Sequence, residues 1–149
     1  PESLQKACRS LETGRTGLLG GPESRENDLE SLYTQIGKLN SARIYQIGRI
    51  LELGGSLERI HEISGFDRWF LREMVKIVDI ERELRESELT PELLHRAKRL
   101  GESDRRIAEL TGRRESEIRQ ERHRAGIRPG FKTVDTCAAE FSSNTPYLY

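Results

Sequence analysis

DRWFLREMVKIVDIEREL, residues 67–84, is the stretch that decides the fold. Asp67 is a favoured helix N-cap, and the apolar positions after it repeat at helical spacing. These positions spread beyond one stripe, so the helix needs neighbours on several sides. We therefore expect it to be the central helix of an all-α fold, with core packing favoured over an aromatic ligand pocket. Its predicted core residues are Trp69, Phe70, Met74, Ile77 and Val78.

Segments on both sides of this helix also have helical periodicity, with start and stop signals at their ends. Asn40-Ser41 and Thr90-Pro91 are predicted helix starts, and Gly65 and Gly101 are predicted stops. Residues 13–24 are rich in glycine, but no Gly-Lys-Ser/Thr follows, so a plain connector is expected instead of a phosphate loop. Residues 1–12 are also predicted to be helical. Further apolar stripes at helical spacing are Leu29, Leu32, Tyr33 and Ile36; Ile44, Ile47, Ile50 and Leu51; Leu57, Ile60 and Ile63; and Leu93, Leu94, Ala97 and Leu100.

Two parts of the chain resemble each other at a fixed offset. SLERIHEISG begins at Ser56 and SDRRIAELTG begins at Ser103, with matching serine, arginine, isoleucine, glutamate and glycine positions. Because no insertion is needed to align them, we expect two similar helical units of about 42–86 and 90–127. Each would consist of a helix, a short helix, a tight turn and a longer helix, in a helix-turn-helix-like arrangement around the central helix.

The second unit by itself also fits a nucleic-acid-binding helix-turn-helix, which is the main alternative. The arginines of its recognition helix that would contact the nucleic acid are Arg113, Arg114, Arg119 and Arg122. Glutamates alternate with these arginines, the chain has 25 basic and 25 acidic residues, and its pI is about 7.3. A nucleic-acid domain usually has a clear excess of positive charge, so we expect no nucleic-acid partner.

The composition predicts a thin core and an intracellular environment. Hydrophobic residues make up 34% of the chain and charged residues another 34%, against about 25% charged in an average domain. Cys8 and Cys137 are the only cysteines, and we expect two free thiols, with Cys137 buried and inert.

The sequence has no recognisable signal peptide and no apolar run of about 18 residues, so a cytoplasmic location without membrane contact is expected. The chain begins with Pro1 and reads as part of a longer polypeptide.

No group of residues has the spacing of an active site. His61, His95 and His123 are scattered, none at metal-ligand spacing from another histidine or a cysteine. We therefore predict no catalytic, cofactor-binding or metal-binding residues in this segment, and a complete enzyme is the least favoured hypothesis. A run of glutamates is predicted to be a solvated face: Glu81, Glu83, Glu86 and Glu88.

Three sequence motifs, in this order, resemble a known family. ESLQKACRSLETG (2–14) comes first, FDRWFL (66–71) second, and a C-terminal motif, FKTVDTCAAEFSSNTPYLY (131–149), last. In the family the last motif has a lysine, Val or Ile, Asp-Thr, Ala-Ala-Glu, an aromatic residue, and then Thr and tyrosines. The chain is similar to the large subunit of carbamoyl-phosphate synthase, except at about 18–41, where no motif matches. In this chain the positions that correspond to the C-terminal motif of the family are Lys132, Val134, Asp135, Thr136, Ala138, Ala139, Glu140, Phe141, Thr145, Tyr147 and Tyr149.

The resemblance implies the helical oligomerisation domain between the two ATP-grasp synthetase halves of that subunit. Residues 1–14 would end the first half, 15–27 would be the glycine-rich connector, 28–127 the helical domain, and 128–149 an extended lead-in to the second half. The expected role is that of a non-catalytic spacer and association domain, a homo-oligomer that contacts the flanking halves.

The resemblance also implies the chemistry of the parent enzyme. It is an ATP-dependent ligase that makes carbamoyl phosphate from bicarbonate, two ATP and ammonia, which a small glutaminase subunit supplies from glutamine. The product serves arginine and pyrimidine biosynthesis. ATP, Mg²⁺ or Mn²⁺, and K⁺ would bind in the flanking halves, and no cofactor is expected in this segment.

Overall fold

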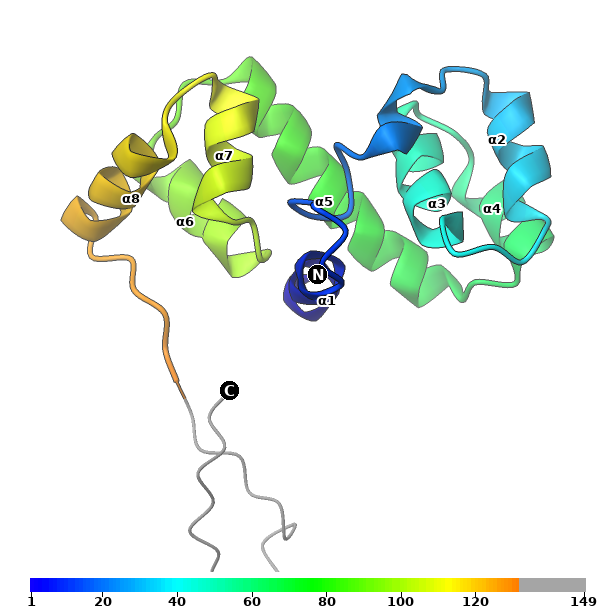
Figure 1. The fold of residues 1–149 in the computed structure, drawn as a ribbon, viewed down its shortest axis with the longest axis horizontal. Helices are drawn as coiled ribbons and strands as arrows, with labels where there is room; N and C mark the ends of the chain where they lie inside the picture. Colours follow the sequence, from blue (N-terminus) through cyan, green and yellow to red (C-terminus); the bar gives the residue numbers. More distant parts are fainter. Residues whose placement is uncertain (132–149) are drawn as a thin grey trace, which may run out of the picture.

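The computed structural model describes residues 1–131, which contain α-helices, one short 3₁₀ helix and no strand. The prediction of an all-α fold is confirmed. In Figure 1 the long helix α5 runs through the molecule, with α2–α4 at one end, α6–α8 at the other, and α1 against its middle. The helices are α1 (Glu2–Ser10), η1 (Pro22–Arg25), α2 (Leu29–Ile36), α3 (Arg43–Glu52), α4 (Leu57–Ser64), α5 (Arg68–Glu86), α6 (Pro91–Arg99), α7 (Asp104–Thr111) and α8 (Glu115–Arg124).

Most predicted helix ends are confirmed. The Asp67 side chain accepts from the Trp69 N–H at the start of α5, and the Thr90 hydroxyl accepts from the Leu93 N–H at the start of α6. Gly65 follows α4 with φ +73°, a left-handed conformation that favours glycine. The Asn40-Ser41 start is wrong: α3 begins at Arg43, and the Asn40 side chain instead accepts from the Ala42 N–H in the preceding turn.

The helix bounds agree with the predicted internal offset at two pairs of helices. The helices α4 and α7 span Leu57–Ser64 and Asp104–Thr111, and α5 and α8 begin at Arg68 and Glu115. The two helices of each pair therefore start 47 residues apart. Similarity of the two units in three dimensions stays a prediction.

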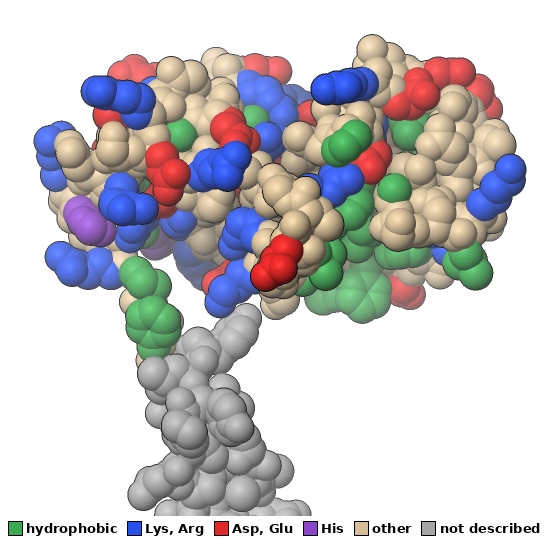
Figure 2. All heavy atoms as spheres, in the orientation of Figure 1, with side chains coloured by type: hydrophobic (Ala, Val, Ile, Leu, Met, Phe, Trp, Pro, Cys, Tyr) green, Lys and Arg blue, Asp and Glu red, His purple; other side chains and the backbone are tan. Residues whose placement is uncertain are grey.

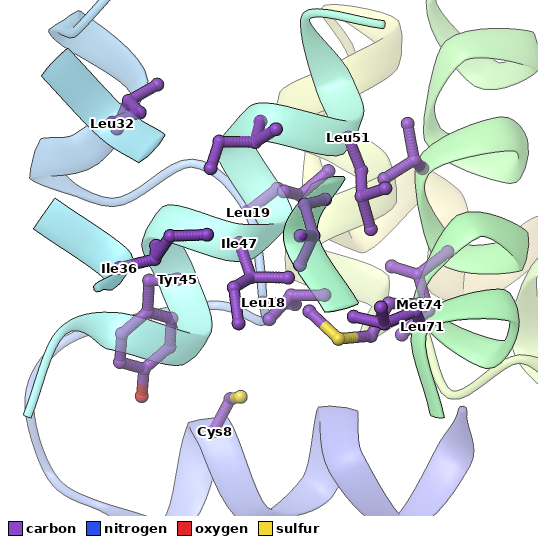
Figure 3. Packing of buried hydrophobic residues seen from close by; sticks show 14 of the residues in the cluster. Cys8, Leu18, Leu19, Leu32, Ile36, Tyr45, Ile47, Leu51, Leu71 and Met74 are labelled. Carbon is purple, nitrogen blue, oxygen red and sulfur yellow. The ribbon is translucent and has the colours of Figure 1, made fainter. Parts of the chain in front are cut away.

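The first hydrophobic core forms where α2, α3, α4 and the first half of α5 meet (Figure 3). Leu71, Met74, Ile77 and Val78 are the contribution of α5. The glycine-rich connector also enters this core, because its Leu18 and Leu19 are almost fully buried. The remaining buried members are Cys8, Leu32, Tyr33, Ile36, Tyr45, Ile47, Ile50, Leu51 and Ile60.

The second hydrophobic core lies between the last part of α5 and helices α6, α7 and α8. Ile80 and Leu84 belong to it, although Val78, two residues before Ile80, belongs to the first core. A single helix is therefore part of both cores. The other buried members are Leu93, Leu94, Ala97, Ile107, Ala108 and Ile118.

The core prediction for α5 is right for three residues and wrong for two. Met74, Ile77 and Val78 are buried, but Trp69 and Phe70 are 59% and 58% exposed. Phe70 precedes Met74 by four positions and so lies on the same side of the helix. It is exposed because the helices packed on α5 cover Leu71 in the first turn of α5 and leave the neighbouring Phe70 side of that turn open. Periodicity indicates which side of a helix is apolar, but it does not indicate where the partner helices end.

A buried ion pair connects α5 to α7, and it corrects the prediction of a solvated glutamate run. Glu81 is fully buried, and the Arg106 guanidinium donates to both of its carboxylate oxygens, at 3.0 Å to Oε1 and 2.5 Å to Oε2. This bidentate geometry offsets part of the cost of removing two charges from water. Glu86 and Glu88 are exposed, as predicted, and Glu83 binds Arg96 at the surface.

Helix α1 is attached to both units. On one side Cys8 belongs to the first core, and on the other the Gln5 side-chain amide donates to Glu102 Oε1. Arg9 Nη1 donates to the Gly101 carbonyl at 2.7 Å. Gly101 has φ +92°, and a Cβ there would lie 2.7 Å from the Glu2 Cα. The close approach of α1 therefore requires glycine at this position.

We expect Gly101→Ala to lower the free energy of unfolding by about 3 kcal/mol, because it combines left-handed strain with a clash against the α1 backbone. Urea unfolding monitored by circular dichroism measures this. The control is Gly65→Ala, which has the same left-handed φ but an open space around its Cβ position. It should cost about 1 kcal/mol, and equal losses in the two variants would contradict the close packing of α1 on Gly101.

We expect stability to fall as pH rises through the window in which Glu102 titrates. Burial, and then the nearby Glu81 carboxylate, raises the pKa of Glu102 from 4.5 to about 8. Between these values the folded protein keeps a proton that the unfolded chain releases, so the stabilisation is complete below pH 4.5 and is lost by about pH 8.

Glu102→Gln should remove this loss and melt about 5 °C higher than the parent chain at pH 8.5. Differential scanning calorimetry at pH 5 and pH 8.5 tests the expectation. Glu88→Gln, at an exposed position, is the control and should change the melting temperature little at either pH. A parent chain whose stability is flat between these pH values would contradict the assignment.

Candidate functional site

We searched the described residues for a metal centre. Among residues 1–131 there is no group of three or more His, Cys, Asp or Glu side chains that could hold a metal ion. His61, His95 and His123 lie on three different helices, and His61 Nδ1 is 2.7 Å from the Phe66 carbonyl oxygen. Burial raises the pKa of the Cys8 thiol, which disfavours the reactive thiolate, while Cys137 lies outside the described residues.

The four arginines of the nucleic-acid alternative are all in ion pairs with carboxylates. A recognition helix needs uncompensated cations to contact phosphates, so this arrangement does not favour nucleic-acid binding. The pairs are Arg113–Glu121 at 2.7 Å, Arg114–Glu117 at 2.6 Å, Arg119–Glu115 at 3.4 Å and Arg122–Asp104 at 3.1 Å.

An apolar groove of about 570 Å³ lies between the start of α1 and the start of α5. The exposed rings of Trp69 and Phe70 stand at its edge, edge to face, with their centroids 4.9 Å apart. Figure 2 shows hydrophobic side chains gathered beside the end of α1, below α5. A pair of exposed aromatic rings at an apolar hollow is typical of a protein–protein contact. The remaining lining residues are Pro1, Ser3, Leu4, Ile44, Phe66, Asp67, Glu73 and Met74.

A polar cleft of about 580 Å³ lies on the other side of α1, bounded by α6, the start of α7 and the 127–130 segment. Figure 2 shows Lys and Arg side chains gathered between α1 and the α6–α8 end. We call this feature the basic cleft. The residues that line it are Glu2, Lys6, Arg9, His95, Lys98, Arg99, Gly101, Glu102, Ser103, Asp104, Arg105, Glu115, Arg122, Ile127, Arg128, Pro129 and Gly130.

Glu102 lines the basic cleft, and the sequence did not indicate that it would be buried. Glu102 is 1% exposed, and its Oε2 is buried without a hydrogen-bond partner. Gln5 and Arg106, which surround this carboxyl group, are also buried. Gln5 is separated from Glu102 by 97 positions in the sequence, so no local pattern could have predicted their contact.

The described helices carry no segment that is both long enough and apolar enough to span a bilayer. This finding covers residues 1–131.

Comparison with known proteins gives one consistent result. Residues 1–126 match the family model described as "Carbamoyl-phosphate synthetase large chain, oligomerisation domain". The chain is 42% identical to the carbamoyl phosphate synthase large chain of a Nostoc species, over 99% of this chain and 14% of that protein. It is 43% identical to the N-terminal section of the large chain from Aquifex aeolicus, over 99% of this chain and 26% of that protein.

An archaeal relative shows similar identity. The large chain of Methanosarcina barkeri is 44% identical over 99% of this chain and 13% of that protein. The chain thus spans less than a third of the length of each of these relatives. The family model and the relatives agree with the motifs in the sequence, and the chain belongs to the carbamoyl-phosphate synthase large-chain family, in which it corresponds to the oligomerisation domain.

Proposed function

We propose that this domain is a rigid, non-catalytic spacer between two synthetase halves, and that it also joins copies of the large chain. In the longer protein one half would phosphorylate bicarbonate and the other carbamate, with ammonia from a small glutaminase subunit. ATP, Mg²⁺ or Mn²⁺, and K⁺ would bind in those halves. The product, carbamoyl phosphate, would serve arginine and pyrimidine biosynthesis.

The observation that carries the spacer proposal is the continuity of α5 through both cores. Val78 is buried in the first core and Ile80 in the second, with no loop between them. The two units can therefore not turn against each other without breaking the helix or unpacking a core. A second connection comes from Arg85, which bridges Glu52 at the end of α3 and Glu81, at 3.0 Å in each case.

Rigidity of this kind suits an enzyme that passes an unstable intermediate between two sites. A flexible linker would let the sites sample many relative positions, whereas a helical body holds one. In the proposed arrangement a synthetase half would lie on each side of the domain, so the relative position of the halves would depend on α5.

The apolar groove supports the association part of the proposal, with a second copy of this chain as the occupant. Trp69 and Phe70 project beside a hollow of about 570 Å³, so the same patch holds both a protruding group and a receiving surface. A twofold-symmetric interface requires such a self-complementary patch. The oligomerisation named in the description of the matching family model agrees with this assignment.

The spacer role predicts the effect of a proline between the two cores. Asp79 is exposed on α5 between Val78 and Ile80, and Asp79→Pro removes a helical hydrogen bond and kinks the helix. In the full-length large chain with its glutaminase partner, we expect carbamoyl phosphate synthesis to fall at least about tenfold through misplaced sites. ATP hydrolysis stimulated by bicarbonate alone should stay within about twofold, since the first half is unchanged.

The matched control is Arg68→Pro, at the first position of the same helix. Proline is tolerated there, and Asp67 before it already has the extended backbone that a following proline requires. Arg68→Pro should leave both assays near the parent values. If Asp79→Pro does the same while its folded structure shows the kink, α5 does not set the spacing of the halves.

The association role predicts a concentration-dependent mass. We expect the 149-residue chain, of 17.1 kDa, to dimerise in sedimentation equilibrium, and Trp69→Ser with Phe70→Ser to weaken dimerisation at least about tenfold. Trp69 is the only tryptophan, so its fluorescence should shift to shorter wavelength as the dimer forms.

Leu39→Ser is the control for general surface hydrophobicity, because Leu39 is 89% exposed and lies outside the groove. It should leave the dimerisation constant unchanged. A chain that stays monomeric at millimolar concentration, or equal effects of the two changes, would exclude the groove as the contact between copies.

A further inference from the structure

The basic cleft differs in charge from the rest of the protein. The whole chain carries 25 basic and 25 acidic residues, but the cleft is lined by seven Lys or Arg side chains, one His and four Asp or Glu side chains. We propose that it binds a small phosphorylated molecule, held by Arg9, Arg99 and Arg128 above the Glu102 carboxyl group. This proposal does not depend on the spacer or association roles.

Several cations of the cleft already have carboxylate partners. Lys98 and Arg122 both bind Asp104, at 2.8 Å and 3.1 Å, and Arg105 binds Glu109 at 3.3 Å. These contacts hold α6, α7 and α8 together around the cleft. The paired residues form the wall of the cleft, and they contribute little to its net positive charge.

Other cations of the cleft are available to a ligand. Arg99 and Arg128 are exposed, and within residues 1–131 neither has an ion-pair or hydrogen-bond partner. Arg9 donates to the Gly101 carbonyl, a neutral group, so its positive charge is not neutralised by that bond. The three guanidinium groups come from three separate segments that meet at the cleft: α1, α6 and the 127–130 segment. Guanidinium groups match the geometry of phosphate oxygens through paired N–H donors.

The Glu102 carboxyl group provides a second, independent indication of an anion. Its Oε1 accepts from Gln5, while its Oε2 is buried without a partner, an arrangement that native proteins rarely leave unexplained. Burial raises the pKa of Glu102 to about 8, so the group is mostly protonated at neutral pH. In this neutral form Glu102 does not repel an anion bound in the cleft that it lines.

Protonation also explains why the cleft favours an anion over a cation. A charged Glu102 would cancel one of the arginines, whereas the neutral acid leaves the positive excess intact. A cleft of about 580 Å³ is in the size range of sites for small metabolites. The cleft is small, and its available cations are guanidinium groups that match the oxygens of a phosphate. These two properties together indicate a small ligand that carries one or more phosphoryl groups.

Calorimetric titration of the 149-residue chain with pyrophosphate tests the proposal at pH 7 and low ionic strength. We expect saturable one-to-one binding that Arg99→Ala with Arg128→Ala weakens at least about tenfold. The matched control is Arg25→Ala with Lys38→Ala, which removes the same charge from exposed positions outside the cleft. It should change the affinity by less than about twofold, as expected for exposed charges at a distance.

The role of Glu102 has its own readout in the pH dependence of sulfate binding, because sulfate keeps a constant charge between pH 7.5 and 9. We expect affinity for sulfate to fall about tenfold over this range in the parent chain, as Glu102 loses its proton. Glu102→Gln is uncharged at every pH and should bind sulfate with a nearly flat profile. The charged groups that face Glu102 are Glu81 from α5, Arg106 from α7, Arg9 from α1 and, at its carbonyl, Lys98 from α6.

Three outcomes would overturn the proposal. The first is no pyrophosphate binding at millimolar concentration, and the second is equal weakening by the cleft and control variants. The third is a polyglutamate peptide that binds more tightly than pyrophosphate and with the same dependence on Arg99 and Arg128. This result would assign the cleft to an acidic protein segment. A sulfate profile that is the same for Glu102→Gln and the parent chain would remove Glu102 from the site.

Discussion

The continuous burial of α5 in two cores is the constraint on which the rest of the structure depends. Its 19 residues form one uninterrupted helix, with Leu71 buried in the first core and Leu84 in the second. Each unit has a small core and would bury little apolar surface alone. Because they share one helix, they form a single body, and the orientation of one unit defines that of the other.

Polar contacts at the junction of the two units add specificity to this arrangement. The Arg106–Glu81 pair joins α7 to α5, and the Gln5–Glu102 contact joins α1 to the turn before α7. Buried charges are costly unless they are fully paired, and a change in the relative position of these helices would separate them. Burial at this junction, and then the nearby Glu81 carboxylate, raises the pKa of Glu102, so the junction that orders the units is also sensitive to pH.

Helix α1 contributes residues to both candidate surfaces, the apolar groove and the basic cleft. Leu4 faces the apolar groove, while Lys6 and Arg9 line the basic cleft on the other side. The helix is held in place by Cys8 in the first core and by its close approach to Gly101. An association surface and an anion-binding surface would thus lie on one element, and a movement of α1 would change both.

The sequence by itself determined most of the secondary structure and the family. Residues such as Asp67, Thr90 and Gly65 act on their own helix ends, and the apolar spacing along α5 follows from 3.6 residues per turn. These are local effects, so they can be predicted without knowledge of the rest of the chain. The family motifs have the same local character, and the comparisons confirm the family.

Only the tertiary structure decided which apolar and charged side chains are buried. Phe70 has the spacing of a core residue but lies on a side of α5 that no described helix covers at that turn. Glu81 resembles its exposed neighbours but meets Arg106, 25 positions away. Arg59 and Arg106 even match at the internal offset, yet one pairs with Glu30 at the surface and the other is buried. Burial depends on which distant segments pack together, and this information is not contained in any short stretch of the sequence.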